Sequence, residues 1–163
     1  MGATESRKER DAVLPFDESV GYQIRQTHRL LQRYLQEKIG PHGVTPGMWY
    51  FLRALWHQDG MTQSELSLVV GTMEPTTLTA IKSMERSGLV TRIKNVDDRR
   101  KINVYLTEKG KALRAELMPL AKEVVEDSVQ GFSERERLAF LEFLKAIQDN
   151  LMTRMSEQVG RPE

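Results

Sequence analysis

The most constraining feature of the sequence is a change of hydrophobic period at residue 89. Residues 62–70 and 74–87 carry apolar side chains at helical spacing, whereas residues 89–94 and 102–106 are short and rich in β-branched side chains. The two β-branched segments flank a charged turn, so they predict a β-hairpin with a long tip. Two short helices that are joined by a tight turn and followed at once by a hairpin predict a winged helix-turn-helix.

Capping signals set the limits of the two short helices. Thr62-Gln63-Ser64-Glu65 is a capping box, and Gly71 ends the helix that it opens. Glu74-Pro75 begins the next helix, which ends at Ser87-Gly88. The side chains expected to face inward are Leu66, Val69, Val70, Thr77 (through its methyl group), Ala80, Ile81 and Met84.

Longer helical patterns precede this module. Residues 17–39 form the first, with Asp17 as the expected N-cap, and it stops at the breaker Gly40-Pro41-His42-Gly43. A second helix begins at Thr45-Pro46 and ends near Asp59. The apolar residues of these helices are Val20, Ile24, Leu31, Leu35 and Ile39 in the first, and Met48, Leu52, Leu55 and Trp56 in the second.

Two more helices follow the hairpin. Thr107 caps the first, in which Pro119 is expected to kink or divide the apolar stripe, and Gly131 ends it. Ser133-Glu134-Arg135-Glu136 is a second capping box and opens the last helix. The apolar stripes are Leu113, Leu117, Leu120 and Val124 in the first, and Leu138, Leu141, Phe143 or Leu144, Ile147 and Leu151 in the second.

The chain is therefore expected to be mainly α-helical with a small β-hairpin wing. The long amphipathic helices at both ends need a surface to pack on, and a second copy of the chain is the economical partner. We expect four parts: a mobile N-terminal tail at 1–15, an N-terminal dimerisation helix at 16–40, a winged helix-turn-helix at 45–106 and C-terminal dimerisation helices at 107–157.

The composition excludes several kinds of site. The 163 residues include no cysteine, which rules out disulfides, Cys-ligated zinc, iron–sulfur clusters and thiol chemistry within the chain. His28, His42 and His57 have no paired metal-ligand spacing, and the sequence has no Walker loop, nucleophile elbow or H-E-x-x-H motif. We therefore expect no metal, no cofactor and no enzymatic activity. The N-terminus lacks the apolar core of a signal peptide and no apolar run could span a bilayer, so we expect a cytoplasmic protein.

The formal net charge of +1 hides a strongly basic segment. Residues 82–114 hold ten Lys or Arg against four Asp or Glu, a net charge of +6, so the rest of the chain carries −5. This segment covers the end of the second short helix and the whole hairpin. A local basic patch is typical of nucleic-acid-binding surfaces.

Two elements of the basic segment are candidates for DNA contacts. The helix that begins at Glu74 occupies the place of a recognition helix, and its polar side chains suit phosphates or base edges in a major groove, with a plain polar helix face as the alternative. The turn Asp97-Asp98-Arg99-Arg100-Lys101 concentrates three cations that suit a minor groove, with a solvated surface turn as the alternative. The exposed face of the helix is expected to present Thr76, Thr79, Lys82, Ser83 and Arg86.

The hairpin resembles the wing of MarR-type transcription regulators. The family pattern is D-x-R followed after a few residues by L-T-x-x-G, which fits Asp98, Arg100 and the run Leu106-Thr107-Glu108-Lys109-Gly110. Further similarity covers Glu74-Pro75-Thr76-Thr77, residues 84–90 and the helix order from about residue 17 to residue 151. The resemblance implies a homodimer whose terminal helices interdigitate and whose two winged helices bind a pseudo-palindromic operator in double-stranded DNA.

By the same resemblance, Arg100 enters the minor groove and Asp98 orients it through a charged hydrogen bond. Many family members carry arginine where this chain has Thr79, so the resemblance does not carry over the base contacts or the operator sequence. The residues expected to contact DNA are Thr76, Thr77, Thr79, Lys82, Ser83, Arg86, Asp98, Arg99, Arg100 and Lys101.

The resemblance also implies a small-molecule effector, because MarR-type regulators commonly bind aromatic carboxylates and sometimes acyl-CoA thioesters. An aromatic wall with one or two cations suits a planar anion. The candidate residues are Tyr22, Arg25, His28, Arg29, Trp49, Tyr50 and Arg53, for which core or dimer packing and surface ion pairs are the alternative.

The expected function is therefore that of a ligand-responsive repressor, which binds its operator as a homodimer and is released by the effector. The alternative is a winged-helix dimer that serves only as a protein-interaction module and binds no operator.

Overall fold

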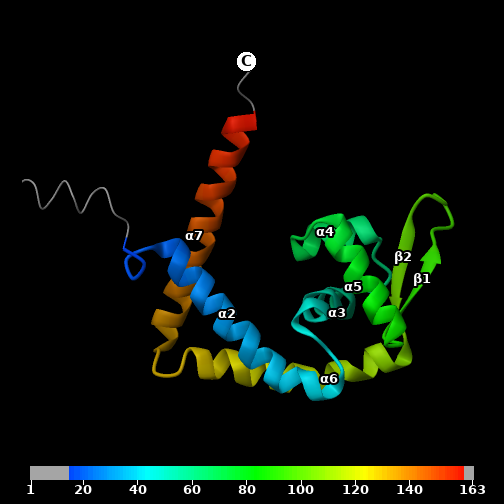
Figure 1. The fold of residues 1–163 in the computed structure, drawn as a ribbon, viewed down its shortest axis with the longest axis horizontal. Coiled ribbons are helices and arrows are strands. Elements are labelled where there is room, and N and C mark those ends of the chain that lie inside the picture. The colour runs from blue at the N-terminus through cyan, green and yellow to red at the C-terminus, as the bar shows by residue number, and fades with distance from the viewer. Residues whose placement is uncertain (1–14, 160–163) are drawn as a thin grey trace, which may run out of the picture. The chain divides into compact units, whose positions relative to one another are not determined.

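The computed structural model describes residues 15–159, and this part of the chain holds six α-helices, one short 3-10 helix and a two-stranded antiparallel sheet (Figure 1). The mainly α class with a hairpin wing is thereby confirmed. The elements are α2 (Val20–Ile39), η1 (Gly40–His42), α3 (Pro46–His57), α4 (Gln63–Val70), α5 (Glu74–Arg86), β1 (Val90–Lys94), β2 (Ile102–Leu106), α6 (Glu108–Ser128) and α7 (Glu134–Val159).

The chain divides into two compact units, one up to Val124 and the other from Val125 onwards. The first unit contains the winged helix-turn-helix, and the second contains the end of α6 and all of α7. Of the tail predicted at residues 1–15, only Pro15 lies among the described residues. No helix in the described part of the chain is both long and apolar enough to cross a membrane.

The N-cap predicted at Asp17 is wrong, because α2 begins after a turn that takes up residues 16–18. The backbone amides of Glu18 and Ser19 donate to the carbonyls of Pro15 and Phe16. Ser19 is the N-cap, and its Oγ accepts a hydrogen bond from the amide of Tyr22 at 3.3 Å. The helix ends as predicted at the breaker, where Gly43 closes η1 with φ of 77°.

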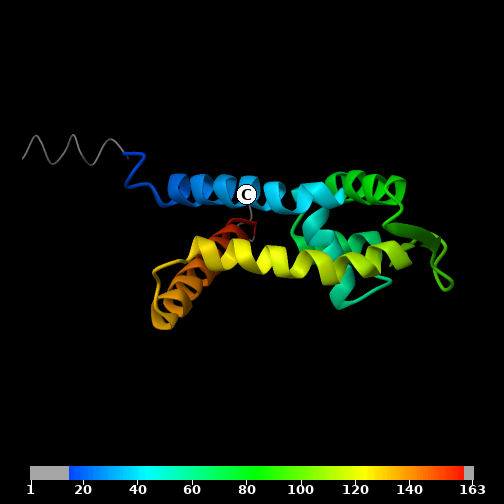
Figure 2. The same ribbon diagram turned by 90° about the horizontal axis from the view of Figure 1, so that it is seen from below.

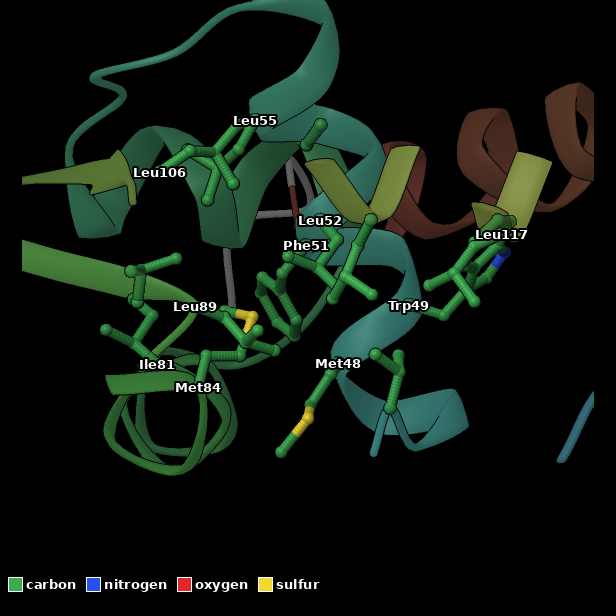
Figure 3. Close-up of a cluster of buried hydrophobic side chains, with 14 of the residues drawn as sticks. Met48, Trp49, Phe51, Leu52, Leu55, Ile81, Met84, Leu89, Leu106 and Leu117 are labelled. Carbon is green, nitrogen blue, oxygen red and sulfur yellow. The ribbon is translucent and has the colours of Figure 1, made fainter. Parts of the chain in front are cut away.

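The core of the first unit lies between α3, α5, the hairpin and α6 (Figure 3). Leu52 from α3, Ile81 from α5 and Leu117 from α6 are completely buried. A close-packed interior of this kind supplies most of the free energy that holds short helices in place. The helices and the hairpin therefore form one scaffold for the side chains on the outer surface.

Helix α4 has the predicted capping box, but Val69 does not face inward. Thr62 Oγ1 accepts from the Glu65 amide, and the Glu65 carboxylate accepts from the Thr62 amide. The inward face runs through Gln63, Leu66, Ser67 and Val70, at i, i+3, i+4 and i+7, which leaves Val69 on the outside with 58% exposure.

The strands pair in the register that runs from Val90 opposite Leu106 to Lys94 opposite Ile102. Helix α6 follows, and Pro119 does not divide it as the sequence suggested it could. The proline removes one backbone hydrogen bond, but Leu117 and Leu120 on either side of it pack into the core and hold the helix. Figure 2 shows the end of α2 alongside α6, where Lys38 pairs with Glu123.

In the second unit, α7 begins at the predicted capping box. Ser133 Oγ accepts from the Glu136 amide, and the Glu136 carboxylate accepts from the Ser133 amide and hydroxyl. The predicted apolar stripe is largely uncovered, since Leu144 and Ile147 are half-buried and the other members are exposed. The exposed large apolar side chains of α7 are Leu138, Phe140, Leu141, Phe143, Leu151, Met152 and Met155.

Candidate nucleic-acid interface

Helix α5 presents most of the predicted contact residues on its solvent face. Thr76, Thr79, Lys82 and Arg86 are exposed, and Ser83 is half-buried. Pro75 stands in the first turn, where it has no hydrogen bond to lose. The opposite face is anchored by Ile81 and Met84, so the polar face is held against a fixed support.

Thr77 departs from the predicted contact set, because its side chain is only 1% exposed. Its hydroxyl accepts from Ser67 Oγ at 2.8 Å, lies 2.8 Å from Thr72 Oγ1 and donates to the Met73 carbonyl. The position follows from the period, since residues 77, 81 and 84 share the inward face. Thr77 therefore fastens α5 to α4 and offers no side-chain contact to a ligand outside.

The wing tip is ordered by Asp98 and Arg100. The Arg100 Nε donates to Asp98 Oδ1 at 3.0 Å, and its Nη2 donates to Asp98 Oδ2 at 3.1 Å. These bonds hold the pKa of the Asp98 carboxyl below its ordinary value and raise the pKa of the Arg100 guanidinium. The Arg100 side chain is nevertheless 91% exposed, so a fixed cation projects from the hairpin. Arg99 and Lys101 beside it are exposed as well.

A basic hollow of about 280 Å³ lies between α5 and β1. Arg92 lines it together with Thr79, Lys82, Glu85 and Arg86. Both Nε and Nη2 of Arg92 lie 2.9 Å from Glu85 Oε2, so the carboxylate fixes this guanidinium in the same way that Asp98 fixes Arg100. Arg92 belongs to the basic segment and follows Glu85 across the turn at Gly88, but it was not among the residues predicted to contact DNA.

The L-T-x-x-G run forms the joint between the wing and α6. Thr107 donates from its amide to the Leu89 carbonyl at 3.0 Å and from its hydroxyl to the Gly88 carbonyl at 2.7 Å, and its Oγ1 caps the Gly110 amide. A Cβ on Gly110 would lie 2.1 Å from the Leu89 carbonyl oxygen, so only glycine allows this approach. The Trp56 indole donates to the Gly110 carbonyl at 2.9 Å, which ties the joint to α3.

The predicted effector residues do not form one cluster within the described part of the chain. Trp49 is only 3% exposed and makes an edge contact with Trp56, with ring centroids 5.8 Å apart, so it is a core residue as the alternative held. Arg53 lies over the Trp49 ring, and the Tyr50 hydroxyl accepts from Gln32 at 3.4 Å.

The other four candidates lie on α2. Tyr22 is half-buried beside Phe16, whereas Arg25, His28 and Arg29 are exposed along the helix.

Two hollows beside α3 are instead lined by a different set of side chains. One, of about 350 Å³, lies between α3 and α6 and is bordered by Arg53, Trp56, His57, Arg114 and Met118. The other, of about 590 Å³, lies between α3 and α4. Its lining residues are Tyr50, Arg53, Ala54, His57, Gln58, Met61, Val69 and Val70. Only Tyr50 and Arg53 of the predicted set take part in either hollow.

The histidines do not gather with carboxylates into a metal site. No group of three or more His, Asp or Glu residues with that arrangement occurs within residues 15–159. His42 Nδ1 lies 3.0 Å from Glu116 Oε2, which joins η1 to α6.

The model of the MarR family matches residues 44–102. The chain is similar to a MarR transcriptional regulator from Methanosarcina mazei Go1 whose crystal structure is known, with 33% sequence identity and a TM-score of 0.75. The match covers 82% of this chain and 96% of that one. The HTH-type transcriptional regulator TtmR of Methylorubrum extorquens is 26% identical over 91% of this chain and 75% of its own length. BpsR of Bordetella bronchiseptica, whose DNA binding is regulated by 6-hydroxynicotinic acid, is 25% identical with a TM-score of 0.78, over 84% of this chain and 98% of that one.

Proposed function

The chain belongs to the MarR family of winged helix-turn-helix transcription regulators, and from this premise we propose that it is a repressor that binds a pseudo-palindromic operator as a homodimer. The observation that carries the proposal is the wing tip, where Asp98 holds the exposed Arg100 by two side-chain hydrogen bonds. A cation fixed in this way enters a minor groove without losing side-chain freedom on binding.

Helix α5 supplies the second part of the DNA contact. Thr76, Thr79 and Ser83 offer hydroxyls to base edges or phosphates, whereas Lys82 and Arg86 neutralise phosphates. Arg92, which Glu85 fixes beside them, adds a further phosphate contact. The major-groove helix and the minor-groove arginine then read neighbouring parts of one half-site.

A second copy of the chain completes the binding unit. Exposed apolar side chains lie on α2, among them Val20, Ile24 and Leu30, and a longer series lies on α7. Apolar surface of this extent on amphipathic helices marks an interface, and a two-fold dimer matches a pseudo-palindromic site. We assign dimerisation to residues 16–40 and 107–157 and operator binding to residues 45–106.

The effector is a small aromatic carboxylate or an acyl-CoA thioester that releases the operator. The hollow between α3 and α6 supports this class of ligand, because Arg53, His57 and Arg114 line it together with the aromatic Trp56. BpsR, whose DNA binding responds to 6-hydroxynicotinic acid, supports an aromatic carboxylate in particular. The effector must bind one dimer geometry more tightly than the other in order to change operator affinity.

In vitro selection from a random duplex library on the full-length chain tests this function. The proposal expects a pseudo-palindromic sequence to be enriched and to bind with a stoichiometry of two chains per duplex. It also expects a panel of aromatic carboxylates and their CoA thioesters to contain compounds that weaken this binding. Failure to enrich any sequence would favour the protein-interaction module instead. Enrichment without a response to the panel would contradict only the proposed effector class.

A further inference from the structure

A chain of hydrogen bonds runs from the loop after α3 to the wing arginine. The Asn103 Nδ2 on β2 donates to the Gly60 carbonyl at 2.7 Å, and its Oδ1 accepts from the Asn95 Nδ2 at 2.9 Å. The Asn95 Oδ1 in turn accepts from the amides of Asp97 and Asp98, both at 2.9 Å. Asp98 then binds Arg100 through both the backbone amide and the guanidinium.

Each end of this series of hydrogen bonds is fixed independently. At the inner end, the Met61 carbonyl accepts from the Val104 amide at 2.8 Å. Gly60 packs so closely on the Tyr105 ring that an added Cβ would lie 2.6 Å from it. At the outer end, the Asn95 amide donates to the Lys101 carbonyl and closes the turn.

The two asparagines can play these roles in only one orientation. Asn95 must present its oxygen to two backbone amides, which leaves its NH₂ group for Asn103. Asn103 must then present oxygen to Asn95 and its NH₂ group to a carbonyl, and the Gly60 carbonyl is in place. Both side chains are partly buried, and so are the bonds that join Asn95 to Asn103, Asn95 to the Asp98 amide and Asn103 to Gly60.

We infer that Asn95 and Asn103 are positioning residues, which fix the wing arginine relative to the body of the helix-turn-helix without touching DNA themselves. A seven-residue turn has no hydrophobic core of its own, and Val96 within it is 93% exposed. The side-chain amides therefore supply the order that packing supplies elsewhere. This inference rests on the proposed operator binding by Arg100.

A double-mutant cycle with Arg100→Ala tests the inference on the duplex enriched by in vitro selection. Asn95→Ala alone should lower affinity about 3- to 10-fold, and in the Arg100→Ala background it should lower affinity by less than about 2-fold. Asn103→Ala should behave in the same way. Gln58→Ala is the matched control, because it removes an exposed side-chain amide outside the predicted contact residues, and it should leave affinity unchanged.

Two outcomes overturn the positioning role while leaving operator binding intact. One is an Asn95→Ala effect that is equal in both backgrounds, since the asparagine would then act independently of Arg100. The other is no effect of Asn95→Ala when Arg100→Ala weakens binding strongly. If Arg100→Ala itself has no effect on affinity, the proposed role of the wing in operator binding is wrong, and the positioning role of the asparagines is not decided by this cycle.

A measurement on the protein without DNA tests the positioning role even when Arg100→Ala leaves affinity unchanged. The Arg100 Nε–H donates to Asp98, so its signal in a ¹⁵N spectrum should exchange with water more slowly than the signal of the exposed Arg99 Nε–H beside it. Loss of this slowly exchanging signal in Asn95→Ala and Asn103→Ala, but not in Gln58→Ala, supports the positioning role. Retention of the signal in all three variants overturns it.

Discussion

Both oxygens of the Asp98 carboxylate accept hydrogen bonds from the Arg100 guanidinium, and the Arg100 backbone amide also donates to Oδ1 at 3.1 Å. The residue that carries the charge and the residue that aims it are thus two positions apart in one turn. A surface ion pair contributes little to the free energy of folding, so the value of this pair lies in orientation.

Replacing Asp98 with alanine should separate orientation from charge. The variant loses a negative charge beside the DNA, which strengthens non-specific binding, but its arginine is no longer aimed. We expect the ratio of affinities for the selected and scrambled duplexes to fall about tenfold. Fluorescence anisotropy with both duplexes at one salt concentration measures this ratio.

Asp97→Ala is the control for that experiment, because it removes the same charge from a neighbouring exposed residue. Both duplexes should then bind more tightly, and the ratio should stay nearly constant. Equal ratios for the two variants would show that Asp98 acts only through its charge.

Gly110→Ala should destabilise the protein by about 3 kcal/mol, because the new methyl group would be forced against the Leu89 carbonyl. Urea unfolding measures the free energy of unfolding. Gly21→Ala is the control, since nothing lies within 4 Å of a Cβ at that position in α2. It should leave stability unchanged or raise it by up to about 1 kcal/mol. A similar small effect at Gly110 would mean that the joint between the wing and α6 is looser than the structure has it.

The capping box of α4 should make stability depend on acid pH. Hydrogen bonds from the Thr62 amide and hydroxyl lower the pKa of the Glu65 carboxyl. Its contribution is therefore complete above the ordinary glutamate pKa of about 4.3 and is lost as the pH falls through the lower folded-state value. The free energy of unfolding of the wild type should approach that of Glu65→Gln over this range.

Urea titrations of both proteins between neutral pH and acid measure this convergence. A difference between wild type and Glu65→Gln that does not shrink in acid would contradict the capping role.

Lys82 should contribute to DNA binding through a phosphate contact and not through a sequence-specific base contact. Lys82→Ala should weaken binding to the selected and scrambled duplexes alike and reduce the slope of log K against log salt by about 1. Lys145→Ala on α7 should leave the slope unchanged. A loss confined to the selected duplex would instead place Lys82 at a base edge.

Local signals in the sequence predicted most of the fold. The capping boxes at Thr62 and Ser133 and the breaker after Ile39 depend on contacts within a few residues, and the two β-branched segments pair with each other across a single turn. The errors arose where a choice depends on the rest of the structure. The turn after Pro15 makes Ser19 the N-cap in place of Asp17, and α6 continues through Pro119 without being divided because Leu117 packs in the core.

The candidate site was predictable in part for the same reason. Asp98 and Arg100 lie in one short turn, and their pairing was predicted from the resemblance to the D-x-R pattern of the family. The burial of Thr77 depends on Ser67 and Thr72 from other elements, and the place of Trp49 in the core depends on α6. The links from Gly60 through Asn103 to Asn95 join residues up to 43 positions apart, and no local pattern marks them.

The affinity of Arg100→Ala for the selected duplex, compared with that of Arg33→Ala, tests the central claim most directly. Both variants lose one exposed guanidinium, but only Arg100 stands on the wing. The account predicts that Arg100→Ala loses about 1–3 kcal/mol of binding free energy with an unchanged unfolding curve, while Arg33→Ala binds as the wild type does. Equal affinities of the two variants and the wild type would contradict it.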